Sequence, residues 1–246
     1  MKLLVCISKT PETTAKIQFK DNDTAFETAG VQYIMNPYDE WYALVRAIEL
    51  KETGGGTVTV LNVGPADNDP VIRKALAIGA DDAVRIDTDP QSSLNVAKQI
   101  AEYAKDKGYD IIFFGKETID YNGSEVGAMV AEFLDQPFLS YASKLEMAGN
   151  NGTITRDIEG GVEVVEVETP FVISAAKGLA EQRIPNMMGI MKSKRKPLAV
   201  ESAVEYADKA KVVSYEKPAE KAAVKLIDPD NMTELVRLLH EEAKVI

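Results

Sequence analysis

The chain has 246 residues, of which 28 are Lys or Arg and 39 are Asp or Glu, so its formal net charge is −11. Hydrophobic residues make up 45% of the chain and charged residues 27%, an ordinary globular composition that excludes a disordered or fibrous chain. The acidic balance also excludes bulk nucleic-acid binding, because neutralising phosphates requires concentrated Lys and Arg.

The first half of the chain alternates between patterns typical of strands and of helices. Short apolar runs predict strands, and apolar residues at helical spacing, such as Trp41, Leu44 and Ile48, predict the helices between them. The expected strands are 3–7, 57–63, 82–86 and 110–114, and the expected helices are 38–52, 68–79, 92–107 and 123–135. This alternation predicts an α/β fold, with a Rossmann-like parallel sheet of the adenine-nucleotide-binding type.

The pattern changes after residue 136. Residues 153–168 are typical of two strands around Gly160-Gly161, which is the signal of a β-hairpin, and a further strand is expected at 171–174. The segment 198–227 has weak periodicity and several charges, so we expect it to lie over another surface.

A helix is expected at the end of the chain. Apolar residues between Met232 and Leu239 have helical spacing, and Asp230 or Asn231 would cap the helix. We therefore divide the chain into an α/β nucleotide-binding domain with an added hairpin and a docking loop, 1–197, and an extended C-terminal arm, 198–246, that we expect to wrap a partner subunit.

Few residues are suited to catalysis or to metal binding. Cys6 is the only cysteine and lies within the first expected strand, and the lone His240 leaves no His/Cys cluster for a metal. Neither a GxGxxG after the first strand nor a P-loop motif occurs. No apolar run approaches the roughly 20 residues that span a bilayer, and the N-terminus lacks the apolar core of a signal peptide. We expect a cytoplasmic chain without stable membrane insertion.

The loop after the strand 110–114 is the most informative candidate site. It reads GKETIDYNGSEVG and opens a helix at the carboxyl end of a parallel strand, where open α/β sheets bind ligands. The backbone N–H groups of Gly123, Ser124, Glu125 and Val126 would point outward with the positive end of the helix dipole, which suits a phosphate. The alternative is an ordinary connection in which Ser124 caps the helix.

Two more loops are expected on the same edge of the sheet. Residues 35–39 begin the first long helix, and 62–65 leave the second strand. Together with Cys6 they could enclose a planar ring and let backbone groups read the edges of adenine. The alternative is that Asn36 or Asp39 simply caps the helix.

Several motifs match one known family in the order in which that family has them. The most specific is Ile154–Val165 (ITRDIEGGVEVV), followed by Pro170. Supporting matches are Asn36-Pro37, AIGAD at 77–81, Gly115-Lys116 and IMK at 190–192. Through these residues the chain resembles the beta subunit of electron transfer flavoprotein along nearly its whole length.

The resemblance implies that this chain is a non-catalytic subunit of a heterodimer and that its partner is a larger alpha subunit. The heterodimer would carry electrons from dehydrogenases, such as acyl-CoA dehydrogenases, to a downstream acceptor. The alpha subunit would hold most of the redox FAD, and this chain would hold AMP, or a second FAD as in members that bifurcate electrons. Carried over by position, the nucleotide site would comprise Cys6, Asn36, Pro37, Tyr38, Asp39, Val63, Gly115, Gly123, Ser124, Glu125 and Val126.

The resemblance also aligns 183–191 with the loop by which the family recognises partner dehydrogenases. Met187 falls at the anchor position, where an apolar side chain enters a pocket of the partner. The alternative is that Met187 and Met188 fill the core. A different class, an adenine-nucleotide-binding enzyme or nucleotide sensor of the same fold, ranks lower, because an enzyme of this type should have a glycine-rich phosphate loop where this chain has SKTPE at 8–12.

Overall fold

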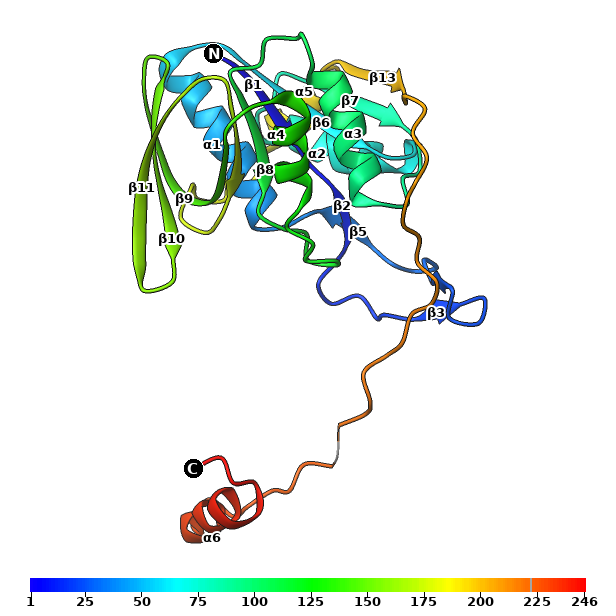
Figure 1. Ribbon diagram of the computed structural model, residues 1–246. Helices are drawn as coiled ribbons and strands as arrows, with labels where there is room; N and C mark the ends of the chain where they lie inside the picture. Colours follow the sequence, from blue (N-terminus) through cyan, green and yellow to red (C-terminus); the bar gives the residue numbers. More distant parts are fainter. Residues whose placement is uncertain (222) are drawn as a thin grey trace.

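One sheet of nine strands organises the residues that the structure describes, 1–221 and 223–246 (Figure 1). In this computed structural model the strand order is β11-β10-β9-β12-β8-β1-β6-β7-β13. The parallel strands are β1 (Lys2–Cys6), β6 (Thr57–Val63), β7 (Asp82–Asp87), β8 (Ile111–Gly115), β12 (Phe171–Ala175) and β13 (Leu198–Ser202). The predicted α/β fold with a mainly parallel sheet is confirmed.

The antiparallel part of the sheet is formed by β9 (Phe138–Ala148), β10 (Asn151–Ile158) and β11 (Gly161–Glu168). β10 and β11 form the predicted hairpin, and Gly160 turns between them with a φ of 81°. β9 joins the two parts, because it pairs parallel with β12 and antiparallel with β10.

Helices cover both faces of the sheet. α1 (Asp39–Gly54) and α2 (Asp69–Ile78) cover one face, and α3 (Ser93–Ala104) and α4 (Val126–Leu134) cover the other. Successive residues of β1 show this, because Val5 packs in the cluster that contains Leu44 of α1, whereas Leu4 packs in the cluster that contains Ile100 of α3. Burial on both faces explains why the central strands are apolar throughout.

The order of the strands reverses between β1 and β8. β1 pairs parallel with β6 on one side and with β8 on the other. The chain moves outward from β1 through β6 and β7 and then returns to form β8 beside β1. Open α/β sheets bind ligands outside the carboxyl ends of the strands at such a reversal. The loops that follow Cys6 and Gly115 therefore meet at the favoured position.

Short strands build a protrusion that the sequence did not predict. β2 (Lys9–Pro11) pairs with β5 (Tyr33–Met35), and β3 (Phe19–Lys20) pairs with β4 (Ala25–Phe26). We call residues 12–32, which connect β2 to β5, the flap. The flap stands out from the body of the molecule in Figure 1.

Two helices begin differently from the prediction. α4 starts at Val126, and its N-cap residue, Glu125, makes no side-chain capping bond, so the interpretation of Ser124 as a cap is wrong. α1 starts at Asp39 after the N-cap residue Tyr38, again without a side-chain cap, so neither Asn36 nor Asp39 caps it. A short 3-10 turn, η1 (Ala66–Asn68), precedes α2.

The C-terminal part of the chain leaves the sheet after β13. Residues 198–202, where the arm was expected to begin, pair parallel with β7, so we use the name arm for 203–246. The arm ends in α6 (Met232–Arg237) and the π-helical turn η2 (Leu238–Glu242), which lie apart from the body in Figure 1. The Asn231 side chain accepts from the N–H of Glu234, which confirms one of the two predicted caps.

Candidate functional site

Asn36 binds together two of the loops expected at the carboxyl edge of the sheet. Its side chain is fully buried, its Nδ2 donates to the carbonyl of Glu117 (3.0 Å), and its Oδ1 accepts from the N–H of Ile119 (3.0 Å). Its own N–H donates to the carbonyl of Ser8 (3.1 Å). Asn36 therefore positions the loop after β8 against the start of α1.

The end of β8 approaches the start of α1 so closely that only glycine fits there. A Cβ on Gly115 would lie 2.8 Å from Cγ of Glu40 and 3.1 Å from Cβ of Asp39. The same Cβ would lie 2.9 Å from the backbone nitrogen of Glu40, which cannot turn aside as a flexible side chain can. Gly115 is thus required by the contact between the two elements.

Glu40, which the sequence did not single out, holds the residues after β1. Its carboxyl oxygens accept from the N–H of Ser8 (2.7 Å) and from the Ser8 hydroxyl (2.5 Å). Burial raises the pKa of Glu40 to about 8, although the bonds from Ser8 act in the opposite direction. Burial also raises the pKa of Asp39 to about 6. An acidic residue in a first helical turn looks in a sequence like a partner of the helix dipole, so no local signal could have revealed this contact.

Tyr38 has a backbone conformation that L residues rarely adopt, with φ 65° and ψ −102°. Its side chain is exposed, between the half-buried Pro37 and the buried Asp39. Such strain costs on the order of 1–3 kcal/mol, persists only where the surroundings impose it, and clusters at ligand sites. This strain makes the carboxyl edge a candidate site on grounds that the sequence did not contain.

The amides expected to meet an anion lie just before α4 and in its first residue. Asn122 and Ser124 have positive φ values of 51° and 52°, so the backbone turns there. Within the described part of the chain, the N–H groups of Gly123, Ser124, Glu125 and Val126 make no hydrogen bond. These donors fit a phosphate. The carboxylate of Glu125 lies 3.6 Å from the position of a Cβ on Gly123. Its negative charge would repel a phosphate at these amides unless the side chain turned away.

Cys6 and Val63 lie at the carboxyl ends of β1 and β6, beneath the loops. Cys6 is buried in the apolar cluster that contains Phe114, and the half-buried Val63 packs against that cluster. Burial raises the pKa of the Cys6 thiol, and the Glu40 carboxylate raises it further. A buried thiol of this kind packs as a small apolar side chain and is not a nucleophile.

Met187 lies away from this edge, at the first residue of α5 (Met187–Ser193). α2 runs from the carboxyl end of β6 to the amino end of β7, and α5 packs on the C-terminal end of α2. Met187 therefore lies at the amino edge of the parallel strands, opposite the edge where the nucleotide loops meet. Met187 is 75% exposed and Met188 is 63% exposed, which excludes the interpretation that they fill the core.

Backbone contacts hold α5 in place. A Cβ on Gly189 would lie 2.5 Å from the carbonyl oxygen of Ala77, so the two helices touch where a larger residue would not fit. The Asn186 side chain caps α5 by accepting from the N–H of Gly189 (2.8 Å). The segment that leads into α5 is held by Trp41 of α1, whose Nε1 donates to the carbonyl of Arg183 (3.2 Å). The methionines are therefore presented on a fixed support.

Comparisons with known proteins agree with this architecture. A family model described as "Electron transfer flavoprotein domain" matches residues 23–219. The electron transfer flavoprotein subunit beta of Bacillus subtilis (strain 168) is 37% identical, with 100% of both chains covered. The Homo sapiens subunit beta is 32% identical over 91% of each chain, and the mitochondrial subunit beta of Oryza sativa subsp. japonica is 33% identical over 100% of both.

The chain therefore belongs to the electron transfer flavoproteins, which are electron carriers. Within that class it is a member of the beta-subunit family, as its sequence motifs predicted, and this membership implies an alpha-subunit partner.

The relatives include bacterial and mitochondrial forms, and the cytoplasmic location expected for this chain stays a prediction. Across residues 1–221 and 223–246, no helix combines the length and apolar character needed to cross a membrane. In the same residues, no group of three or more His, Cys, Asp or Glu side chains could hold a metal ion.

Proposed function

We propose that this chain holds one AMP molecule at the carboxyl edge of β1, β6 and β8, and that α5 presents Met187 to partner dehydrogenases. The alpha subunit holds most of the flavin that exchanges electrons. Dehydrogenases, such as acyl-CoA dehydrogenases, reduce that flavin, and a downstream acceptor reoxidises it. This chain supplies no catalytic residue, because its part is to place the nucleotide and the docking surface.

The unbonded amides of 123–126 carry the nucleotide proposal. They lie together at the start of α4, beside the reversal of strand order, and Asn36 fixes the loop that bears them. A phosphate at this position would accept from several N–H groups at the positive end of the helix dipole. A second FAD, with its pyrophosphate at the same amides, is the alternative occupant.

The first experiment identifies the nucleotide. The heterodimer is purified with its alpha subunit, extracted with acid, and analysed by chromatography for AMP and FAD. We expect AMP and FAD in about equal amounts. Two FAD molecules without AMP would place a flavin at this edge, and one FAD without any second nucleotide would overturn the proposal.

The second experiment tests the amides. Val126→Pro removes one N–H at the first residue of α4, where the N–H has no partner within the helix. Ser124 is unsuitable for this substitution, because its φ of 52° excludes the proline ring. A hydrogen bond to a charged group is worth about 1.5–3 kcal/mol, so Val126→Pro should weaken AMP binding roughly tenfold or more.

Val126→Ala is the matched control, because it shortens the same side chain but keeps the N–H. It should retain AMP as the wild-type protein does, and both variants should retain FAD. Equal AMP contents in the two variants would mean that the phosphate lies elsewhere.

A further inference from the structure

Tyr215 is the residue through which the arm touches the flap. Within residues 207–221 every other residue is exposed, and Tyr215 alone is half-buried. Its ring stacks on Phe19 of β3, with centroids 4.7 Å apart and planes inclined by 11°. Its N–H donates to the carbonyl of Asp23 (2.7 Å), and the arm crosses the flap beside β3 in Figure 1. One half-buried ring on an otherwise exposed segment is a point of attachment.

Two earlier contacts guide the arm toward that point. The Gln99 side chain exchanges two hydrogen bonds with the backbone of Val204 (2.9 and 2.8 Å). The Asp208 carboxylate then accepts from Asn95 (3.0 Å) and from the Ser92 hydroxyl at the start of α3. Among the described residues after Tyr215, every hydrogen bond stays within 228–246. Tyr215 is thus the last attachment before the arm leaves the body.

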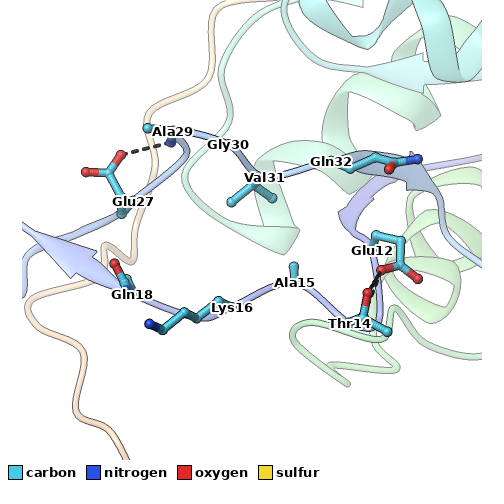
Figure 2. Close-up of a pocket in the computed structure, with 10 residues that line it drawn as sticks. All are labelled: Glu12, Thr14, Ala15, Lys16, Gln18, Glu27, Ala29, Gly30, Val31 and Gln32. Atoms are coloured by element: carbon cyan, nitrogen blue, oxygen red, sulfur yellow. Dashed lines mark hydrogen bonds between the residues drawn. The ribbon is translucent and has the colours of Figure 1, made fainter.

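The flap has little interior packing of its own. Figure 2 shows its two chain segments, 12–18 and 27–32, on opposite sides of a pocket. The volume of this cavity is about 340 Å³. The residues that line this cavity are mostly polar or small, among them Glu12, Lys16 and Glu27. The flap's aromatic contacts are Phe19 with Phe26, at 6.4 Å, and Phe19 with Tyr215. A flap without an apolar interior depends on contacts of this kind to keep its position.

The flap is joined to the carboxyl edge at both of its ends. β2 begins directly after Ser8, which Glu40 holds, and β5 ends directly before Asn36. The two ends are themselves joined, because the N–H of Asn36 donates to the carbonyl of Ser8 (3.1 Å). Movement of the flap would therefore displace Asn36, whose side chain holds the loop that carries the free amides.

We propose that the Phe19–Tyr215 stack latches the arm onto the flap and slows the release of the nucleotide held at the carboxyl edge. This inference rests on the proposed function. Opening the flap requires the stack to break, because Tyr215 is the only half-buried contact of that part of the arm. The arm thus acts on the nucleotide site without touching the nucleotide.

The test measures nucleotide release from the heterodimer. The protein is loaded with labelled AMP and diluted into excess unlabelled AMP, and the label that remains bound is followed over time. Tyr215→Ala and Phe19→Ala should each speed release roughly threefold to tenfold, the effect expected from losing one aromatic pair. The double variant should release no faster than Phe19→Ala, because Phe19→Ala already removes the stack that Tyr215→Ala removes.

Two further variants serve as controls. Tyr215→Phe keeps the stacked ring and should stay near the wild-type rate, and Val213→Ala changes an exposed residue of the same arm and should have no effect. The FAD content is measured in each preparation. A variant that loses AMP faster while keeping FAD supports the latch, whereas equal loss of both reports unfolding and overturns it.

The remaining outcomes separate the two proposals. If wild-type heterodimer binds AMP and Tyr215→Ala releases it at the wild-type rate, the latch is wrong and the nucleotide site stands. If wild-type heterodimer binds no labelled AMP, both proposals fail. Additive effects of Tyr215→Ala and Phe19→Ala would show that the rings act separately, which contradicts a latch made by their stacking.

Discussion

Arg73 and Lys196 join the C-terminal ends of α2 and α5. Arg73, in α2, binds carbonyls at the end of α5, and Lys196, just after α5, binds carbonyls at the end of α2. Arg73 donates to the carbonyls of Ser193 (2.8 Å) and Lys196 (2.6 Å). Lys196 Nζ donates to the carbonyls of Leu76 (2.9 Å) and Ala80. Cations suit these positions, because the last carbonyls of a helix lack partners and form the negative end of its dipole. This exchange fastens α5, whose buried residue is Ser193, to α2.

Arg73→Met should loosen α5 and weaken docking of a dehydrogenase. The variant leaves two carbonyls without their donor, and hydrogen bonds from a charged group are worth about 1.5–3 kcal/mol. We expect roughly tenfold weaker docking, measured as the concentration dependence of flavin reduction by a cognate dehydrogenase. Arg195→Met removes a nearby exposed cation and is the control. Equal effects of the two variants would mean that charge, and not the exchange of contacts, supports docking.

Met187→Ala tests the anchor directly. Burying one such side chain in a partner's pocket is worth roughly 1.5–3 kcal/mol, so docking should weaken about tenfold to a hundredfold. Because Met187 is exposed, the thermal midpoint and FAD content should stay near wild type. Met187→Glu should be worse, since it forces a carboxylate into an apolar pocket.

Met232→Ala, an exposed methionine of α6, controls for the loss of a surface methionine. The flavin of this variant should be reduced by the dehydrogenase as fast as the flavin of the wild-type protein. A Met187→Ala protein of normal stability that is reduced at the wild-type rate would contradict the docking role.

Asn36→Ala should release the loop that carries the free amides. The substitution leaves the carbonyl of Glu117 and the N–H of Ile119 without partners, at a cost of about 1–3 kcal/mol for each unpaired buried group. Asn36→Asp should not rescue the loss, because its carboxylate cannot donate to Glu117. We expect a lower thermal midpoint and less AMP per FAD in the purified heterodimer. An unchanged AMP content in the folded variant would show that this loop does not decide nucleotide binding.

We expect Glu40 to make the free energy of unfolding fall as the pH rises. Its pKa rises from 4.5 when unfolded to about 8 when buried, so the native chain keeps a proton that the unfolded chain releases. The resulting stabilisation is complete below about pH 4.5 and is lost as the pH rises toward 8. Asp39, with a pKa of about 6, adds to the loss in the lower part of this range.

Glu40→Gln removes this titration while keeping an oxygen that accepts from the N–H of Ser8. One pKa unit corresponds to about 1.4 kcal/mol, so the free energy of unfolding of the wild-type protein should fall by more than about 1.4 kcal/mol across the range. The variant should lose less. Urea unfolding at several pH values between about 5 and 8 measures both proteins. Parallel curves would mean that Glu40 is already ionised in the folded chain.

The central strands were predictable because burial on both faces makes them continuous apolar runs. β9 was not predicted, since its buried residues Leu139, Ala142 and Leu145 recur every third residue and not every second, and its pairing with β10 is interrupted by a bulge. β13 was missed because all of its residues after Leu198 are exposed. The two-residue and three-residue strands of the flap region are too short to show a period.

The position of the site was predictable for a topological reason, because the carboxyl ends of neighbouring parallel strands share one edge. The contacts that build it were not. Asn36 binds backbone groups 81 and 83 residues away, and Glu40 binds Ser8, 32 residues before it. Contacts at such separations leave no local pattern in the residues that make them.

The placement of α2 keeps the two proposed tasks of this chain independent. The helix extends from the edge where the nucleotide loops meet to the edge where α5 lies, and the sheet fills the space between. Substitutions within 184–191 can therefore reshape the surface offered to an electron donor without disturbing Asn36 or the loop that it holds. With the proposed functions placed in this way, a lineage could exchange one dehydrogenase for another and keep its nucleotide.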